Sequence, residues 1–132
     1  MADVAAWVEG YRRAWEERDA DAAAALFTDE STYRSNIFEE PHRGPDGVRA
    51  YWSGVTATQR EVSVRMGRPI VDGDRVAVEF WTTMENDGTE VTLPGCLLLS
   101  FDEDGRCRRL HEYYTFTEGR LDPPPEFGGG SA

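Results

Sequence analysis

Residues 75–116, RVAVEFWTTMENDGTEVTLPGCLLLSFDEDGRCRRLHEYYTF, set the architecture of this chain. Polar and apolar side chains alternate through most of this stretch, with the period of two at which strand side chains point to opposite faces. Two turn sequences, ENDGT and DEDG, interrupt the alternation, and their Asp-Gly pairs favour hairpins. The stretch therefore predicts three antiparallel strands over Arg75–Met84, Glu90–Phe101 and Arg106–Phe116.

The alternation extends one segment further towards the N-terminus, over Glu61–Val71, and the turn DGD joins this segment to the next. Before it the period changes to that of helices. The first helix carries an apolar stripe at helical spacing, formed by Val4, Trp7, Val8, Tyr11 and Trp15.

Two more helices are predicted before residue 61. Asp19 or Asp21 caps a short helix over AAAALF that ends near Thr28. A third helix opens at Gly44-Pro45, since proline suits the first turn. Its inner face consists of Val48, Tyr51, Trp52 and Val55. Between these helices, STYRSNI predicts a short strand that can join the sheet.

The DEDG hairpin predicts a register for the last two strands. If Phe101 faces Arg106, Gly95 lies opposite Glu112 and leaves room for its carboxylate. The same register sets Cys96 opposite His111, far along the ladder from Cys107. We therefore expect the two cysteines not to pair with each other.

Composition limits the possible functions. The chain has 132 residues, enough for one domain, and a net charge of −11, which argues against binding nucleic acid or an anionic membrane. No apolar run approaches membrane-spanning length, and the start MADVAAWVEGYRRAW does not resemble a signal peptide, so we expect a cytoplasmic protein. We expect one domain over residues 1–118 and a disordered tail rich in proline and glycine over residues 119–132.

The histidines and cysteines are too few and too scattered for a metal site. The sequence contains two residues of each type, without ligand spacing, and no glycine-rich phosphate loop follows a strand. We therefore expect that the protein needs no metal or organic cofactor.

The order of these elements resembles a known superfamily. The motifs that carry the resemblance are DADAAAALF (19–27), GPDGVRAYW (44–52), GDRVAVEF (73–80), FDEDGR (101–106) and HEYY (111–114). Together they resemble the nuclear transport factor 2-like superfamily, and within it the SnoaL-like branch of small bacterial proteins, over about residues 3–118. The resemblance implies an α+β fold in which three N-terminal helices pack in a curved antiparallel sheet shaped like a cone. It also implies a ligand pocket at the open end and a homodimer.

The resemblance further implies which strand face looks into the pocket. In ketosteroid isomerase and limonene epoxide hydrolase, a residue matching Glu112 faces the pocket, so the alternate residues of the last strand should face it too. The pocket-facing set then consists of Tyr11, Trp15, Tyr33, Ser35, Phe80, Thr82, Met84, Leu97, Leu99, Leu110, Glu112 and Tyr114. The outer set consists of Glu79, Trp81, Cys96, His111 and Tyr113.

The chain departs from the catalytic sets of these relatives. Tyr11 matches the oxyanion-binding tyrosine of ketosteroid isomerase, but Ser35 stands at the position of its base and Leu97 at that of its protonated acid. The arginine and second acid of limonene epoxide hydrolase are absent from the strand that carries Phe80 and Thr82. In SnoaL-type cyclases an acid of the last strand works with a histidine. The resemblance implies that Glu112 is the analogue of that acid, but the sequence does not support the histidine partner.

Two functional hypotheses follow. In the first, Glu112 is a general acid–base with a pKa raised by apolar surroundings, and Tyr11 is an oxyanion donor, so that the protein is an isomerase, cyclase or hydrolase of a small hydrophobic, oxygen-bearing molecule. In the second, Glu112 is only hydrogen-bonded at the pocket mouth, Tyr11 fills the core, and the protein is a non-catalytic ligand-binding or dimerisation module.

Other side chains have simpler interpretations. We expect His42 to lie on a surface loop near the pocket rim, and Cys96 and His111 to be surface or interface residues. The outer aromatic residues Trp81 and Tyr113 would form an exposed apolar patch on a monomer, and they favour a homodimer built sheet to sheet.

Overall fold

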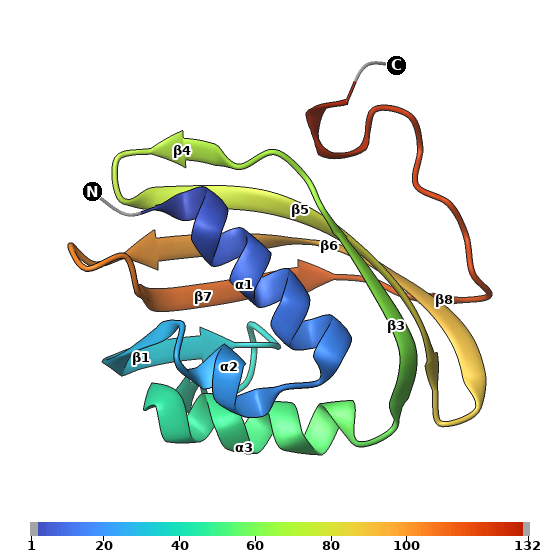
Figure 1. Ribbon diagram of the computed structural model, residues 1–132, viewed down its shortest axis with the longest axis horizontal. Coiled ribbons are helices and arrows are strands. Elements are labelled where there is room, and N and C mark those ends of the chain that lie inside the picture. The colour runs from blue at the N-terminus through green and yellow to red at the C-terminus, as the bar shows by residue number, and fades with distance from the viewer. Residues whose placement is uncertain (1–2, 131–132) are drawn as a thin grey trace.

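Residues 3–130 are described by a computed structural model, in which three α-helices pack against a curved sheet of eight strands (Figure 1). The helices are α1 (Val4–Glu17), α2 (Ala20–Ala24) and α3 (Gly44–Thr56). The strands are β1 (Phe27–Arg34), β2 (His42–Arg43), β3 (Gln59–Met66), β4 (Ile70–Asp72), β5 (Arg75–Asn86), β6 (Thr89–Phe101), β7 (Cys107–Tyr114) and β8 (Thr117–Glu118). The α+β roll predicted from the sequence is confirmed.

The strand order β2-β1-β7-β6-β5-β3 shows how the sheet is assembled, with β4 added beside β5 and β8 beside β6. The pairs predicted as hairpins, β5–β6 and β6–β7, are antiparallel. β1 instead joins β7 in parallel, so the sheet is mixed and not wholly antiparallel. A parallel pair needs a long connection, and here β2, α3 and β3 to β6 lie between the two strands in the sequence.

Three predicted element boundaries are wrong. The segment Glu61–Val71 forms two strands, β3 and β4, because Pro69 in the link Gly67–Pro69 lacks the N–H that a ladder needs. Near the N-terminus, α2 ends at Ala24 and β1 already begins at Phe27, so AAAALF is only partly helical. Asp19 is the residue that caps α2, and its carboxylate accepts from the Ala22 N–H at 3.0 Å.

The predicted register of the β6–β7 hairpin is also wrong, by two residues. Phe101 pairs with Cys107 and not with Arg106, and a bulge between Ser100 and Phe101 shifts the ladder by one residue more. Leu97 therefore lies opposite Glu112, and Gly95 lies opposite Tyr114. A total shift of two residues leaves the side chains beyond the bulge on their predicted faces, because strand side chains alternate with the same period. The inward orientation of Glu112 therefore survives the error.

Gly95 makes room for an aromatic ring of the neighbouring strand. A Cβ atom at this position would come within 2.4 Å of Phe80 Cζ and within 2.6 Å of the Tyr113 carbonyl oxygen. The Phe80 ring in turn meets the Trp15 ring edge-on, with 5.5 Å between the centroids. The missing side chain thus lets the sheet close onto α1.

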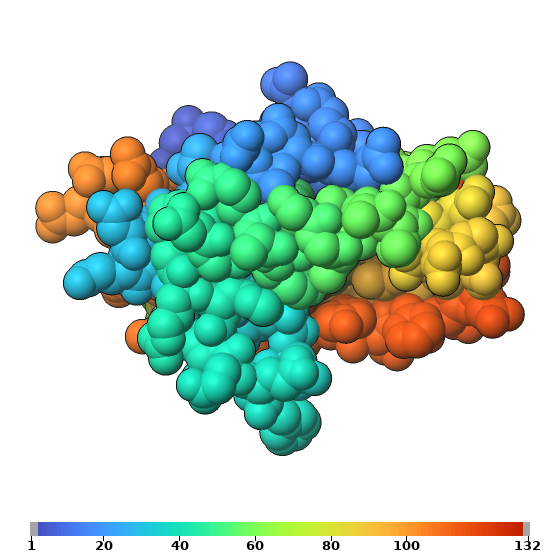
Figure 2. Space-filling model, turned by 90° about the horizontal axis from the view of Figure 1, so that it is seen from below, coloured from blue at the N-terminus to red at the C-terminus, as the bar shows by residue number. Residues whose placement is uncertain are grey.

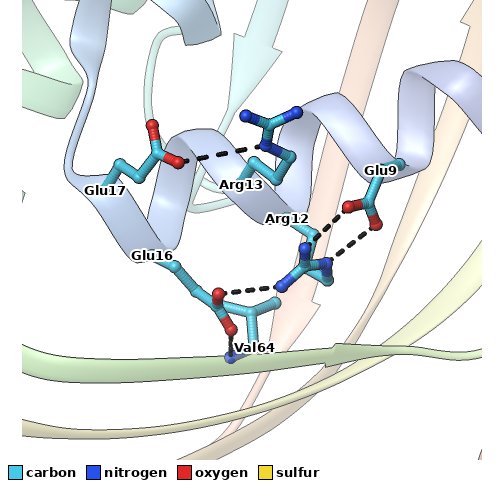
Figure 3. A network of polar contacts seen from close by, with 6 residues as sticks. All are labelled: Glu9, Arg12, Arg13, Glu16, Glu17 and Val64. Atoms are coloured by element: carbon cyan, nitrogen blue, oxygen red, sulfur yellow. Dashed lines mark hydrogen bonds and ion pairs between the residues drawn. The ribbon is translucent and has the colours of Figure 1, made fainter.

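Helix α1 is held to β3 by charged side chains (Figure 3). Arg12 bridges Glu9 and Glu16 on the helix surface, at 2.6 and 2.8 Å. The other oxygen of Glu16 accepts the Val64 N–H at 2.8 Å. Two further side chains donate to β3 carbonyl groups: Arg18 to Gln59 at 2.9 Å, and Arg120 to Glu61 at 3.0 Å.

The segment expected to form a disordered tail follows the outer side of the sheet as far as residue 130. The Trp81 indole N–H donates to the Leu121 carbonyl at 2.8 Å, and the Phe127 ring packs edge-on against Trp81. The Gly128 N–H donates to the Glu79 carboxylate at 2.9 Å. Trp81 faces outward as predicted and is partly covered by the segment. Within residues 3–130, no helix is both long and apolar enough to span a membrane.

We predict that Gly95→Ala destabilises the fold by about 1–3 kcal/mol, because the added methyl group must displace the Phe80 ring and the Tyr113 carbonyl. Chemical denaturation followed by circular dichroism measures the free energy of unfolding.

Gly54→Ala in α3 is the matched control. Apart from its chain neighbours and the nearby backbone of α3, no atom of the described residues lies within 4 Å of the added Cβ. This substitution should therefore raise stability by about 0.5–1 kcal/mol through helix propensity. A Gly95→Ala variant as stable as the wild type would contradict the close approach.

Candidate functional site

A cavity of about 340 Å³ lies between α1, α3 and the end of the sheet. It opens among α3 (green), the β5–β6 turn (yellow) and the end of β7 (orange) in Figure 2. Its walls combine aromatic rings with a few polar groups. They are formed by Tyr11, Trp15, Tyr33, Tyr51, Trp52, Val55, Thr56, Thr58, Gln59, Asn86, Val91, Leu93, Glu112, Tyr114 and Phe116.

Edge-to-face packing fixes the aromatic wall. The Tyr11 ring meets Trp15 and Trp52 edge-on, at centroid distances of 6.1 and 5.4 Å. Tyr33, from β1, packs against Tyr51, from α3, at 5.4 Å. Since one helical face supplies Tyr11 and Trp15, and another supplies Tyr51 and Trp52, the amphipathic stripes of α1 and α3 place all four rings.

Glu112 is the acid of this cavity. It comes from β7 and is 8% exposed. The Tyr33 hydroxyl donates to its carboxylate at 3.4 Å, and the Tyr11 hydroxyl lies 3.3 Å from that of Tyr33. Because Tyr33 donates to Glu112, its oxygen is free to accept a hydrogen bond from the Tyr11 hydroxyl. The three side chains thus form a hydrogen-bonded chain from α1 to β7.

Burial determines the protonation states of these three side chains. It raises the pKa of Glu112 from 4.5 to about 7, and the Tyr33 hydrogen bond opposes the rise. Burial, together with the nearby Glu112 charge, raises the pKa of Tyr11 and Tyr33 well above 10. At neutral pH the two phenols are therefore hydrogen-bond donors, whereas Glu112 exchanges its proton with little cost in either direction.

Two further pairs of polar side chains in the cavity wall are hydrogen-bonded. The Trp15 indole N–H donates to the Gln59 side-chain oxygen at 3.0 Å, and the Thr58 hydroxyl bonds the Asn86 side chain at 2.7 Å. The first pair joins α1 to the start of β3, and the second joins the link between α3 and β3 to the end of β5. They satisfy wall groups and lie apart from the tyrosine–glutamate chain.

The structure brings part of the predicted pocket set together. Five of its members line the cavity: Tyr11, Trp15, Tyr33, Glu112 and Tyr114. Six others face inward but are fully buried in the core below it: Phe80, Thr82, Met84, Leu97, Leu99 and Leu110. They lie too deep because α1 fills the narrow end of the roll. Ser35 lies outside the cavity, in a shallow groove next to it.

Sequence reasoning missed the wall formed by α3 and the segments at the cavity mouth. Tyr51, Trp52 and Val55 were recognised only as the inner face of a helix. The other missed residues are Thr56, Thr58, Gln59, Asn86, Val91, Leu93 and Phe116. The helical stripe contained the signal for the first three, and the alternation of β6 contained that for Val91 and Leu93, whereas the rest lie at or beyond the ends of elements.

His42 is not the surface histidine that the sequence predicts. It lies in β2 opposite Tyr33, half-buried, and its imidazole stacks on the Tyr51 ring at 4.3 Å. Burial lowers its pKa, so a neutral ring is favoured against the tyrosine. His42 is thus a support behind the cavity wall, where it holds Tyr51.

The predicted Cys96–His111 pair does not form across the ladder. Cys96 lies opposite Tyr113, and His111 lies opposite Leu98. Both cysteines are free, and burial raises the pKa of each thiol. Among the side chains of residues 3–130, no group of three His, Cys, Asp or Glu residues is placed to hold a metal ion.

We predict that Glu112 makes stability fall with rising pH. The folded protein keeps this proton up to pH about 7, whereas an unfolded chain releases it near pH 4.5, so the stabilisation is complete below 4.5 and is lost as pH rises through 7. Between these two pH values the free energy of unfolding should fall by about 3 kcal/mol. Urea unfolding of the wild type and of Glu112→Gln over this pH range measures the difference.

Glu103→Gln, in the exposed β6–β7 turn, is the control and should follow the wild type at every pH. If Glu112→Gln also ran parallel to the wild type from pH 4 to 8, the raised pKa would be ruled out.

Solved structures share this fold at low sequence identity. A Catenulispora acidiphila protein with a ketosteroid isomerase-like fold, in complex with trimethylamine, is 20% identical, with a TM-score of 0.75 over 83% of this chain and 85% of the other. The epoxide hydrolase/cyclase-like enzyme SalBIII has a role in pyran ring formation in the polyether salinomycin. It is 21% identical, with a TM-score of 0.77 over 90% of this chain and 100% of the other. A Mycobacterium tuberculosis LEH-like epoxide hydrolase is 21% identical, with a TM-score of 0.68 over 83% of this chain and 80% of the other.

At such identities these structures establish the fold alone. No curated protein sequence matches the chain. The family model of the SnoaL-like domain, however, matches residues 8–110. Because this match covers most of the sequence and agrees with the observed roll, the protein belongs to the SnoaL-like domain family.

Proposed function

We propose that the protein binds a small, mostly apolar molecule that carries an oxygen function, and that Glu112 acts on this oxygen as a general acid–base. The observation that carries the proposal is a buried carboxyl group, with a pKa raised to about 7, inside a cavity walled by aromatic rings. A group that titrates near the working pH is present in both protonation states, which general acid–base catalysis needs.

The neighbours of Glu112 suit both the donation of its proton to a ligand and the removal of a proton by its carboxylate. In its protonated state, Glu112 gives its proton to a ligand oxygen, such as that of an epoxide or a carbonyl group. The carboxylate that remains accepts the Tyr33 hydrogen bond at 3.4 Å, and Tyr11 supports Tyr33 from behind. In the reverse direction, the carboxylate removes a proton from the ligand or from a water molecule. The phenols thus stabilise the charged form without giving up their own protons.

The proposal covers isomerase, cyclase and hydrolase chemistry, all of which begin with a proton transfer at oxygen or carbon. Two structural neighbours, the epoxide hydrolase/cyclase-like SalBIII and a SnoaL-like polyketide cyclase of Shewanella denitrificans, have names in this range. Ketosteroid isomerisation is disfavoured, because Leu97 lies in the core and Ser35 lies outside the cavity. Glu112 therefore acts with tyrosines and without a second acid.

The alternative is a ligand-binding protein without chemistry. It is favoured by the hydrogen bonding of the cavity, since Tyr11, Tyr33 and Glu112 already satisfy one another, as do Trp15 and Gln59. In such a protein the chain of hydroxyl groups would fix the rings, and Glu112 would bind the ligand oxygen without transferring a proton.

A homodimer through the outer face of the sheet is part of the proposal. Tyr113 is exposed there, as an interface residue of a separated subunit would be. Trp81 contributes less than the sequence suggests, because residues 119–130 cover part of it. The boundary that we place at residue 118 separates the domain from this covering segment.

We predict that Glu112→Gln lowers the kcat for an epoxide or ketone substrate by about 10²–10⁴-fold, because the amide cannot exchange the proton. The Kd should change little, since the shape of the cavity is kept. A panel of small epoxides and cyclic ketones is screened for turnover, and binding is followed by the fluorescence of Trp15 and Trp52 in the cavity wall.

The pH profile distinguishes the two roles of Glu112. The kcat falls as pH rises through 7 if Glu112 is the acid, and rises if it is the base. Glu103→Gln, far from the cavity, is again the control. Binding of the panel by both the wild type and Glu112→Gln, with no turnover by the wild type, would favour the binding protein.

A further inference from the structure

A second hollow adjoins the cavity on the other side of the β7 end. This groove has a volume of about 430 Å³, and it shares Glu112, Tyr114 and Phe116 with the cavity. Its opposite wall contains Ile37 and Phe38, from the loop that follows β1. The three shared residues therefore form a partition, with a chamber on either side.

The groove exists because two paired strands separate. The parallel ladder between β1 and β7 ends at the pair Arg34–His111, after which residues 35–41 turn away from the sheet. Side-chain contacts hold this loop open: Arg34 donates to the Glu39 carbonyl at 2.6 Å, and the Asn36 side chain accepts the Phe38 N–H at 3.0 Å. In Figure 2 the turquoise loop projects from the body next to the orange end of β7.

The loop displays its apolar residue to solvent. Phe38 is 94% exposed, and across the groove Phe116 is also exposed. Large apolar side chains that face one another across a groove, and that continue into a ligand cavity, mark a surface that becomes covered on binding. A short loop fixed by its own hydrogen bonds keeps Phe38 at this place instead of letting it fold inward.

We propose that the groove binds the apolar extension of the ligand whose oxygen function lies against Glu112 in the cavity. The substrate class is then an elongated molecule, with a hydrocarbon chain or fused rings on one side of a ketone, epoxide or hydroxyl group. The proposal rests on the proposed function, because it takes the cavity as the site of the oxygen. A cavity of about 340 Å³ by itself is near the lower limit of ligand pockets, and the groove more than doubles the available space.

The test is a series of 2-alkanones of increasing chain length, with binding measured by the fluorescence of Trp15 and Trp52. Wild-type affinity should rise with length, by up to about fourfold for each methylene group, and should continue to rise after the cavity is filled. Phe38→Ser should bind the short ketones as the wild type does, and the long ketones at least about tenfold more weakly. Because Phe38 is fully exposed, its replacement leaves the core intact.

Ile70→Ser, which removes an exposed apolar side chain from β4, is the matched control and should bind the whole series as the wild type does. If affinity stops rising at the short ketones, or if Phe38→Ser binds the long ketones unchanged, the groove proposal is wrong while the cavity stands. If no ketone of any length binds, the proposed cavity function fails together with the groove. Turnover by Glu112 variants plays no part in this outcome.

Discussion

The contact of Trp15 with Phe80, over the bare backbone of Gly95, is the constraint on which the rest of the structure depends. It sets the distance between α1 and the sheet, because any side chain at residue 95 would drive the Phe80 ring into the helix. With this distance fixed, the preceding turn of α1 places Tyr11 against Tyr33. Packing of α1 against the middle of the sheet thus determines the polar geometry of the cavity.

The same enclosure gives Glu112 its chemical character. A carboxylate loses hydration when it is buried among aromatic rings, and one long hydrogen bond from Tyr33 returns only part of that stabilisation. The result is an acid near its midpoint at neutral pH. A stronger donor set would have lowered its pKa and produced a permanent anion, which binds cations well but exchanges protons poorly at neutral pH.

Sequence reasoning succeeded where periodicity carries the information. The alternation in β7 placed Glu112 and Leu110 on one face, and the resemblance to the superfamily identified that face as the inward one. An error of two in the register left this result unchanged, because an even shift keeps each side chain on its face. Depth along the roll was not predictable in this way. Leu97 and Glu112 lie opposite each other and share a face, yet only Glu112 reaches the cavity, because the position of α1 decides where the core ends.

His42 shows a second limit of the sequence. Nothing in EEPHRG indicates that this histidine pairs with Tyr33 across β1 and stacks on Tyr51, because the two-residue strand β2 is too short to show a period. Its position depends on where α3 packs. Contacts of this kind, between segments distant in sequence, come from the assembled fold alone.

The side chains that bind the backbone of β3 bear on how the protein behaves at high concentration. β3 is the outermost strand on its side of the sheet beyond β5, and its outward-facing amide and carbonyl groups would otherwise be free to pair with a strand of another molecule. Glu16 occupies the Val64 N–H, and Arg18 and Arg120 occupy two carbonyl groups. These charged groups block strand addition at this border and so protect the chain against intermolecular β-aggregation.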